Sequence, residues 1–456
     1  MTYQSPELSE QCRLALLAPE GRGVLAIRNG STVRLPRIHI ARFGRSAQQI
    51  TVAVRELFQL DSIVLEFLQE ASTEPRCAVA EILSDVGDLS NRGLSLVDIS
   101  LIHGTDLSDG ECKALLAIAE GNGGNRALLS RVGWLAEARS WIRANAGSRP
   151  CDFTGRLTQF NGGGNFCLLR LETNSGPALW LKAVGEPNLH EYDTTMYLAD
   201  VQPRYLPPIL CSRSDWHAWV MEEVGADLEG TAHFAACARA VEALARLQIA
   251  MLGKAEHLIS CGSAEHRAPA LLVHLEDVFA FVAEAMALQR GGIAPPLART
   301  RVMELKEIVR LALATIEKIG IPHSIAHNDM SLSNVLCDDA RCVFIDWCEA
   351  YLGNPFNAFE LFRVVLNRRV PSSLDWTDEL RTIYAAHWID ILGETEVKVL
   401  LTLTPVLTIY SSLYSRGRLW IETHRNDSLF QRRTRILARH LERASCNPEF
   451  LRLVYR

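Results

Sequence analysis

The chain has 456 residues, with 47 Lys and Arg against 53 Asp and Glu, which gives a formal net charge of −6 at pH 7. This length fits about two to three domains, and a hydrophobic fraction of 48% is too high for a disordered chain. The negative charge argues against a general binder of nucleic acids or anionic membranes, because both surfaces attract a basic excess.

The apolar stretches, the N-terminal residues and the cysteines indicate in which compartment the protein is expected. The longest apolar stretch near the C-terminus, residues 400–413, falls short of the ~20 residues that a membrane span needs. Glu7 and Glu10 precede the first apolar run and no basic leader is present, so we expect no secretory signal and a cytoplasmic protein. The 12 cysteines form no C-x-x-C pair, and we expect them to be reduced and mostly buried.

The first third of the chain reads as a small α/β domain, residues 1–148. Strands are predicted at 24–27 and 33–35, on either side of the hairpin dipeptide Asn29-Gly30, and again at 77–83 and 94–102. Apolar residues at helical spacing predict helices at 111–119 and 134–144. A break at residues 147–150 then marks a linker.

The rest of the chain changes from strands to helices. Strands are predicted between residues 157 and 184, with a turn at 174–177, and residues 149–225 form the strand-rich part. Residues 226–456 are dominated by amphipathic helices, including those around 234–248 and 305–316, and one hairpin at 334–346 interrupts them. The fold class is therefore α+β.

A constellation of acidic and amide side chains lies in and beside this hairpin. His327, Asp329 and Asn334 form H-x-D-x(4)-N, and Asp346 ends the apolar strand 342–345. Phosphoryl transfer from a nucleotide needs such a set: a carboxylate that accepts the proton of the attacking hydroxyl, and oxygen ligands for Mg²⁺. The alternative is structural, with Asp329 and Asn334 as turn formers and Asp346 as a cap.

This segment resembles a known family. The run H-N-D-M-S-L-S-N followed by F-I-D-W-C-E-A-Y-L-G-N-P is similar to the catalytic segment of the aminoglycoside phosphotransferase and choline kinase-like enzymes. The resemblance implies a bilobal protein-kinase-like fold, with a β-rich N-lobe at 149–225 and a helical C-lobe at 226–456. It implies that Asp329 is the catalytic base, that Asn334 and Asp346 are magnesium ligands, and that His327 orients the catalytic loop.

The match departs from the family pattern at a few positions. Asn328 replaces a glycine, and residues 357–360 stand where an aspartate often caps the next helix. Gln248 takes the place of a histidine in the family's L-A-x-L-H helix, although core packing explains that helix nearly as well. Neither of the first two changes removes a group that performs chemistry.

The resemblance also implies partners upstream of the catalytic segment. Lys182 lies in the apolar strand 178–184, where burying a lysine is costly unless an anion meets it. In related kinases this lysine holds the nucleotide's phosphates and pairs with a glutamate on the next helix, for which Glu191 is the candidate. The alternatives without a nucleotide are a lysine at a sheet edge whose ammonium group snorkels to solvent, and a solvated glutamate on the helix.

Two further segments complete the expected nucleotide site. Gly162, Gly163 and Gly164 precede the strand 166–171 and would let the backbone approach the phosphates, although three glycines are as often a plain loop. Glu222 and Val224 lie in a segment that resembles the inter-lobe hinge, where backbone groups would read the base.

The N-terminal domain carries a weaker resemblance. Residues 55–57 look like a degenerate Nudix box, but Gln59 and Leu60 stand where the hydrolase has glutamates, so magnesium-pyrophosphate chemistry loses its ligands. We expect a Nudix-like fold without that activity, and an amphipathic helix explains the same residues. Its expected role is docking, homodimer formation or substrate capping.

The sequence thus favours a small-molecule kinase that uses ATP or GTP with Mg²⁺ and acts on a hydroxyl of an aminoglycoside-like antibiotic or related metabolite, with no nucleic-acid or membrane partner. The alternative is a catalytically silent kinase-like protein that binds nucleotide or regulates. No G-x-x-x-x-G-K-[ST] loop supports a P-loop enzyme, and no D-F-G or A-P-E segment supports a protein kinase. Glu349 would face either a cation of the acceptor or solvent.

Overall fold

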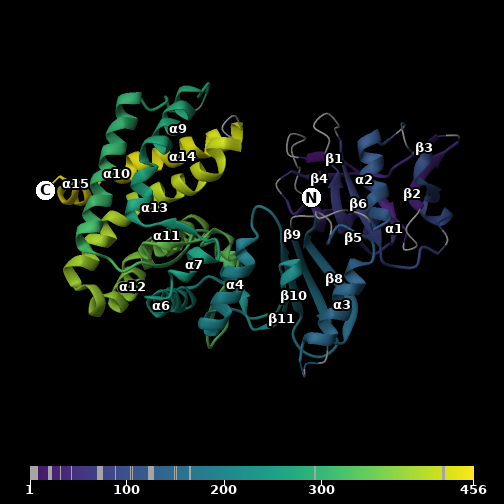
Figure 1. The fold of residues 1–456 in the computed structure, drawn as a ribbon, viewed down its shortest axis with the longest axis horizontal. Coiled ribbons are helices and arrows are strands. Elements are labelled where there is room, and N and C mark those ends of the chain that lie inside the picture. The colour runs from purple at the N-terminus through teal and green to yellow at the C-terminus, as the bar shows by residue number, and fades with distance from the viewer. Residues whose placement is uncertain are drawn as a thin grey trace. The chain divides into compact units, whose positions relative to one another are not determined.

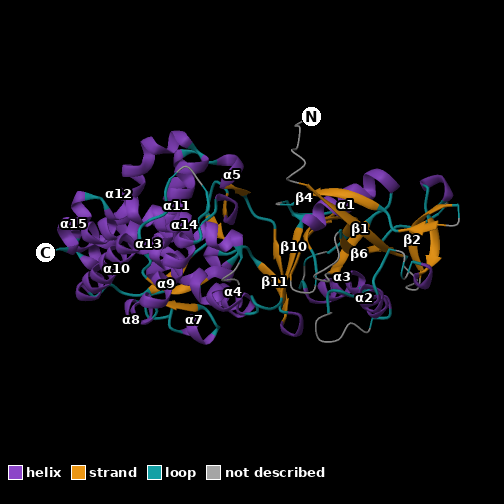
Figure 2. Cartoon of the chain, turned by 90° about the horizontal axis from the view of Figure 1, so that it is seen from above, coloured by secondary structure: helices purple, strands orange, loops and turns teal. Residues whose placement is uncertain are grey.

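The computed structural model describes most of the chain. The described residues are 9–18, 23–30, 32–42, 44–68, 75–87, 89–102, 104, 106–121, 128–147, 149, 151–163, 166–291, 294–423 and 427–455, with the backbone alone for 416–423. The chain divides into two compact units, Met1–Tyr192 with Pro208–Glu223, and Asp193–Pro207 with Val224–Arg456. Strands dominate the first and helices the second, which confirms the predicted α+β class (Figures 1 and 2).

A seven-stranded sheet forms the first part of unit 1. Its order is β3-β2-β1-β6-β5, with β4 paired to β1 and β7 to β2; β1 and β6 are parallel and the other pairs antiparallel. The strands are β1 (Ser9–Leu17), β2 (Gly23–Asn29), β3 (Thr32–Arg34), β4 (Arg37–Ala41), β5 (Ser62–Leu68), β6 (Arg76–Ile82) and β7 (Ser95–Asp98). The hairpin at Asn29-Gly30 is confirmed, and Gly30 has the positive φ of 62° that this turn requires. The strand predicted at 94–102 is shorter, because Ile99–Leu101 form a 3₁₀ turn.

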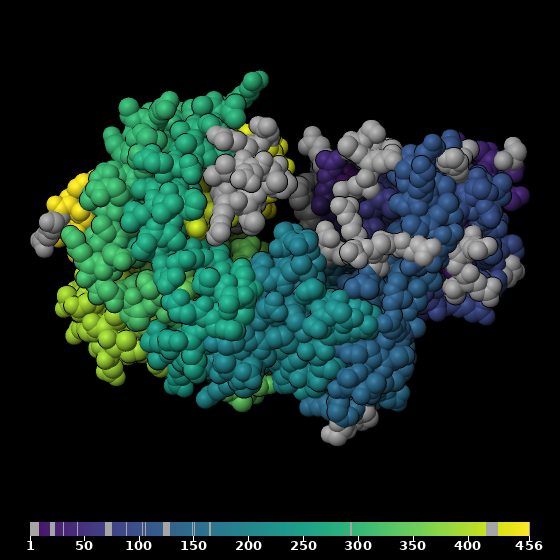
Figure 3. All heavy atoms as spheres, in the orientation of Figure 1, coloured from purple at the N-terminus to yellow at the C-terminus, as the bar shows by residue number. Residues whose placement is uncertain are grey.

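Helices cover both faces of this sheet. Leu14 and Leu16 of β1 pack in the cluster that contains the buried residues of α1 (Ser46–Phe58), whereas Ala15 and Leu17 pack with α2 (Asp109–Ala119) and α3 (Trp134–Asn145). Successive strand residues point to opposite faces, so an unbroken apolar run fits a strand that is buried on both sides. In Figure 3 the blue residues of the α2 and α3 region lie in front of the purple N-terminal strands.

A second, five-stranded sheet follows in the same unit. Its order is β11-β12-β10-β9-β8 with all pairs antiparallel, and its strands are β8 (Phe153–Asn161), β9 (Phe166–Thr173), β10 (Leu179–Val184), β11 (Ile209–Arg213) and β12 (Ala218–Glu222). One face of this sheet, including Leu169, Leu181 and Val220, packs in the same apolar cluster as α2 and α3. The segments expected as N-terminal domain and N-lobe therefore share one core, and the three-part domain division stays a prediction.

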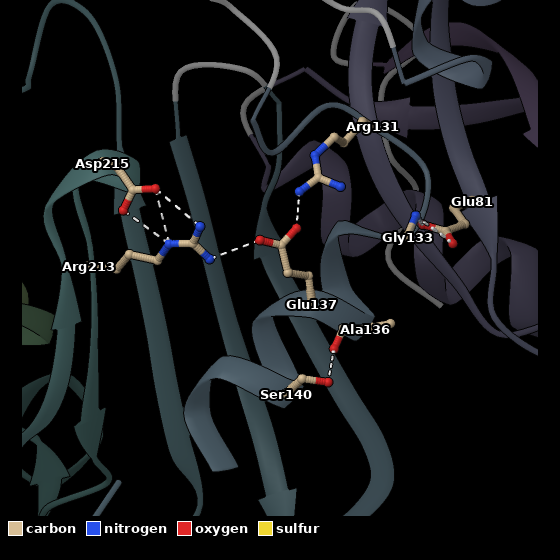
Figure 4. A network of polar contacts seen from close by, with 8 residues as sticks. All are labelled: Glu81, Arg131, Gly133, Ala136, Glu137, Ser140, Arg213 and Asp215. Atoms are coloured by element: carbon tan, nitrogen blue, oxygen red, sulfur yellow. Dashed lines mark hydrogen bonds and ion pairs between the residues drawn. The ribbon is translucent and has the colours of Figure 1, made fainter. Parts of the chain in front are cut away.

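Polar contacts tie α3 to both sheets (Figure 4). Glu137 of α3 accepts hydrogen bonds from Arg131 and, at 3.0 Å, from Arg213 of β11. Burial raises the pKa of Glu137, but the bonds from the two arginines outweigh it, and its pKa is lowered. At the start of α3, the N–H of Gly133 donates to both carboxylate oxygens of Glu81, on β6, at 3.1 Å.

Unit 2 is a helical assembly with two small sheets. Its helices are α5 (Leu228–Thr231), α6 (Phe234–Ala250), α7 (His257–Ser260), α8 (Ala268–Val273), α9 (Leu275–Ala287), α10 (Arg299–Ile319), α11 (Phe356–Arg369), α12 (Thr377–Leu392), α13 (Glu394–Thr423), α14 (Ser428–Ser445) and α15 (Pro448–Val454); α4 (His190–Val201) spans the division between the units. The apolar faces predicted for α6 and α10 are buried, and α10 ends at Gly320 with a φ of 67°. One sheet holds β13 (Ala226–Asp227), β16 (Val335–Cys337) and β17 (Cys342–Phe344); the other holds β14 (Ala264–His266), β18 (Ala350–Gly353) and β15 (Ser324–His327).

The β16–β17 hairpin corrects one expectation. Cys337 and Cys342 are directly cross-strand neighbours and form a disulfide, so the prediction that all cysteines are reduced is wrong for this pair. The sequence pattern missed it because a spacing of five residues matches no disulfide or metal signature.

Within the described residues, one helical stretch, Glu394–Ser415 of α13, is long and apolar enough to cross a membrane by length and composition. Of its apolar window, 67% is buried inside the structure. A core helix of a globular protein meets the same criterion, so this finding is weak evidence for a span.

Candidate active site

The predicted catalytic segment forms a hydrogen-bonded loop between β15 and β16. The backbone N–H of Asp329 donates to His327 Nδ1 at 3.2 Å. Asn334 Nδ2 donates to the Asp329 carbonyl at 3.0 Å and to its carboxylate Oδ2 at 3.1 Å. His327 is buried and Asp329 is partly exposed, so the loop holds the carboxylate at the surface of the unit in a fixed orientation.

Backbone contacts join the same loop to Asp346. His327 Nε2 lies 2.9 Å from the carbonyl oxygen of Ile345, and the N–H of Ile345 donates to the carbonyl of Asn334 at 3.1 Å. Asp346 itself has φ 67° and ψ 65°, a left-handed conformation that is uncommon for a residue other than glycine. Strained backbone of this kind persists where the surroundings fix it, and it clusters at functional sites.

Asn334 and Asp346 fit a magnesium ion by ligand type. Val335 of β16 pairs with Phe344 of β17, so Asn334 and Asp346 lie at the same end of the hairpin. Asn334 is buried, and because its Nδ2 is engaged by Asp329, its Oδ1 is the atom left for a cation. A carboxylate and an amide oxygen are the hard ligands that Mg²⁺ prefers. The structure therefore brings four predicted site residues of unit 2 together: His327, Asp329, Asn334 and Asp346.

In unit 1, Lys182 and Glu191 form a buried ion pair. The side chain of Lys182 on β10 contacts Glu191 at the start of α4, and these residues are 4% and 1% exposed. The Lys182 ammonium also lies 5.3 Å from the ring centroid of Phe166 and 5.7 Å from that of Trp219. The alternatives of a snorkelling lysine and a solvated glutamate are wrong, because both side chains are enclosed.

The glycine turn between β8 and β9 is described in part. Gly162 and Gly163 are described, whereas Gly164 lies outside the described residues. Gly163 has a φ of 133°, which residues with a side chain rarely adopt. A Cβ at Gly162 would lie 2.9 Å from the carbonyl oxygen of Val64, on β5. Packing against β5 thus requires glycine at position 162.

Two residues of the predicted hinge segment, Glu222 and Glu223, donate backbone hydrogen bonds at the end of β12, which lies between β11 and β10. The N–H of Glu222 donates to the Pro208 carbonyl at 3.0 Å, and that of Glu223 to the Ala178 carbonyl at 2.9 Å. A backbone contact from Glu222 to a base would therefore use its carbonyl. Val224 follows Glu223 and begins the second segment of unit 2. Its backbone contact with a base stays a prediction.

Sequence reasoning missed Glu223, which is fixed on the sheet. Arg170 donates to its carboxylate at 2.6 and 2.9 Å, and Trp180 Nε1 donates at 3.2 Å. The hydrogen bond from Arg170 lowers the pKa of Glu223, against the opposing effect of burial. Arg170 and Trp180 are directly cross-strand, but only the register of β9 and β10 reveals it.

Asn328 and Glu349 belong to a polar cluster that the sequence pattern did not reveal. Asn328 Nδ2 donates to Glu349 at 3.1 Å and to Ser415 at 3.4 Å. Ser415 in turn lies 3.2 Å from the ring nitrogen Nε2 of buried His266. The residue that stands in place of the family pattern's glycine therefore donates to the exposed carboxylate of Glu349.

Gln248 supports the catalytic loop from within the core. This fully buried side chain donates to the carbonyls of Pro355 at 2.8 Å and Ile325 at 3.3 Å, and accepts from the Tyr384 hydroxyl at 2.7 Å. Ile325 lies on β15, two residues before His327, so the amide anchors the strand that leads into the loop.

Comparisons with known proteins identify similar folds. No protein-family model matches the sequence, and no curated protein matches it. A choline kinase from Cryptosporidium parvum Iowa II is 12% identical, with a TM-score of 0.48 over 71% of this chain and 100% of that one. A choline/ethanolamine kinase family protein from Mesorhizobium loti is 15% identical, with a TM-score of 0.43 over 70% and 98% of the two chains.

A third solved structure is a spectinomycin phosphotransferase in complex with ADP and spectinomycin. It is 12% identical, with a TM-score of 0.39 over 70% of this chain and 97% of that one. Because the TM-scores are all below 0.5, the function is argued from the chain's own residues. The chain is thus similar, at 12–15% identity, to solved structures of small-molecule kinases and of a spectinomycin phosphotransferase.

Proposed function

We propose that this protein is a magnesium-dependent phosphotransferase that moves the γ-phosphoryl group of ATP or GTP to a hydroxyl of a small molecule. The observation that supports the proposal is the hydrogen-bonded set of His327, Asp329 and Asn334, joined through Ile345 to Asp346. A structural turn would need neither a carboxylate fixed by an amide nor a second aspartate in a strained backbone at the same end of the hairpin.

Each residue would have a distinct role in the reaction. Asp329 accepts a hydrogen bond from the acceptor hydroxyl and takes its proton as the phosphoryl group transfers. Lys182, held by Glu191, donates to the nucleotide's phosphates and offsets their charge. Asn334 and Asp346 would hold Mg²⁺, which supplies charge neutralisation to the phosphates when bound. Transfer is direct, so no covalent intermediate on the protein is needed.

The acceptor side favours an amine-bearing molecule such as an aminoglycoside-like antibiotic or a related metabolite. Glu349 presents an exposed carboxylate that accepts a hydrogen bond from Asn328, the residue before Asp329 in the chain. A carboxylate so placed attracts an ammonium group and orients a neighbouring hydroxyl toward the base. We further propose that the enzyme acts in the cytoplasm, with the N-terminal domain forming a homodimer contact or a cap over the substrate.

An acceptor screen tests the function. Consumption of ATP and GTP is measured with Mg²⁺ over a panel of aminoglycosides, nucleoside antibiotics, amino alcohols and sugars. Asp329→Asn should lower kcat by about 10²–10⁴-fold on the active acceptor while nucleotide affinity stays unchanged. The matched control is Asp338→Asn, in the turn of the same hairpin, where Asn keeps the oxygen that accepts from two backbone N–H groups. Equal turnover by wild type and Asp329→Asn on every acceptor would refute the assignment.

A further inference from the structure

The N-terminal domain reaches the glycine turn through one buried amide. Gln159 of β8 is completely buried, and its Oε1 accepts from the N–H of Val64 at 2.7 Å while its Nε2 donates to the carbonyl of Val64 at 2.8 Å. Val64 lies on β5, and β5 and β8 are the terminal strands of their respective sheets. A single side chain thus pairs with the backbone of the other sheet as a neighbouring strand would.

Both strands are irregular at this point. The register of β5 on β6 shifts between Val64 and Glu66, and that of β8 on β9 shifts between Gln159 and Asn161. A bulge bends its strand and leaves backbone groups outside the regular ladder. The two bulges coincide with the contact between Gln159 and Val64, which indicates a specific contact between the two sheets. We call this contact the junction.

The junction extends into the glycine turn itself. The position of a Cβ on Gly162 would be 2.9 Å from the Val64 carbonyl oxygen, and that on Gly163 would be 3.4 Å from Glu66 Oε1. Glu66 is held in turn by the hydroxyl of Ser130 at 2.9 Å. The two described glycines therefore lie against β5.

A second contact holds the end of β8 from its other face. The guanidinium carbon of Arg45 lies 5.0 Å from the ring centroid of Phe160, and Phe160 stacks on Trp180 with centroids 5.0 Å apart. Trp180 lies two residues before Lys182 on β10, so the two side chains share a face of the sheet. Residues of the N-terminal domain thus contact both faces of the strand that enters the glycine turn.

We propose that Gln159 is a positioning residue through which the N-terminal domain sets the conformation of the glycine turn at Gly162 and Gly163, which makes this domain part of the nucleotide site. The effect on nucleotide rests on the proposed function, whereas the effect on the turn does not. Without the amide, both backbone groups of Val64 lose their partner and the turn loses its support. The N-terminal domain would thus affect nucleotide binding by keeping the glycine turn ordered.

The experiment compares two chemically matched variants of the full chain. Gln159→Leu removes the junction, and Gln49→Leu is the control, because Gln49 makes the same paired contact with the N–H and carbonyl of Ala41, at 2.7 and 3.2 Å, inside the N-terminal domain. Amide hydrogen exchange of the peptide spanning residues 157–168 is measured without nucleotide. We expect about tenfold faster exchange in Gln159→Leu and no change there in Gln49→Leu.

Nucleotide binding gives the second readout. With the active acceptor, Gln159→Leu should raise KM for ATP about tenfold with kcat within about threefold, because the turn positions phosphates but performs no chemistry. Arg45→Ala, at an exposed position, is the second variant and should speed exchange of the same peptide to a smaller extent.

The outcomes separate the two ideas. Unchanged exchange of the turn in both Gln159→Leu and Arg45→Ala overturns the positioning role, as do equal changes in Gln159→Leu and Gln49→Leu. If exchange rises only at the turn but wild type neither binds nucleotide nor turns over any acceptor, the proposed function fails and the positioning of the turn stands.

Discussion

The buried pair Lys182–Glu191 gives the sharpest energetic test. Removing one partner of an enclosed pair leaves an uncompensated charge and costs about 3–5 kcal/mol of unfolding free energy. For Glu191→Gln we expect about 3 kcal/mol, because the ammonium keeps the faces of Phe166 and Trp219 at 5.3 and 5.7 Å. Lys182→Met removes the ammonium that contacts the buried carboxylate of Glu191, and we expect a cost in the same range.

A double-mutant cycle measures the coupling. Urea unfolding of the full chain, followed by tryptophan fluorescence, is compared for wild type, Glu191→Gln, Lys182→Met and the double variant. The double variant should be about 2 kcal/mol more stable than the sum of the single costs predicts, since neither charge remains. Additive costs below about 1 kcal/mol each would refute the inference that the two charges are enclosed and paired.

Three further predictions concern stability. Gly225→Ala should destabilise the fold by about 1–3 kcal/mol because Gly225 has a φ of 53°, and further because the new Cβ would lie 2.5 Å from the Cys337 carbonyl oxygen. Gly253→Ala is the control, because Gly253 has a φ of 73° but a Cβ there would meet no atom within 4 Å. Gly225→Ala should lower the urea midpoint more than Gly253→Ala does. Burial raises the pKa of Glu81, so the folded state loses stability as the pH rises through that pKa and the carboxylate becomes charged. Glu81→Gln should therefore raise Tm at pH 7 but not at pH 4. Equal changes of Tm at the two pH values would contradict this. Reductant should lower the unfolding free energy by about 2 kcal/mol through the Cys337–Cys342 disulfide, and a Cys342→Ser variant that still responds to reductant would exclude this cause.

Much of the candidate site could be predicted because its signals are local. His327, Asp329 and Asn334 lie within eight consecutive residues, so their hydrogen bonds follow from one loop. Lys182 and Glu191 are nine residues apart, and their pairing was implied by the resemblance to related kinases, with helical spacing placing Glu191 on the next helix. The predicted helices in the second half were confirmed for the same reason, since amphipathic periodicity is a local property.

The rest depends on contacts between distant strands. Gln159 and Val64 are 95 residues apart and Arg170 and Glu223 are 53 apart, and a single hydrogen-bonding side chain leaves no periodic pattern in the sequence. The parallel pairing of β1 with β6 is equally non-local, because residues buried on both faces do not alternate. The shared core of the two sheets in unit 1 could not be foreseen for this reason.

The amide of Gln248 has a consequence for how the protein responds to acidity. A histidine, which the family's helix pattern carries at this position, gains or loses charge between about pH 5 and 8. A glutamine has no proton to exchange in that range, so the scaffold beneath β15 keeps its donors and acceptors unchanged. This amide therefore contributes no titration of its own to the pH profile of turnover near neutrality.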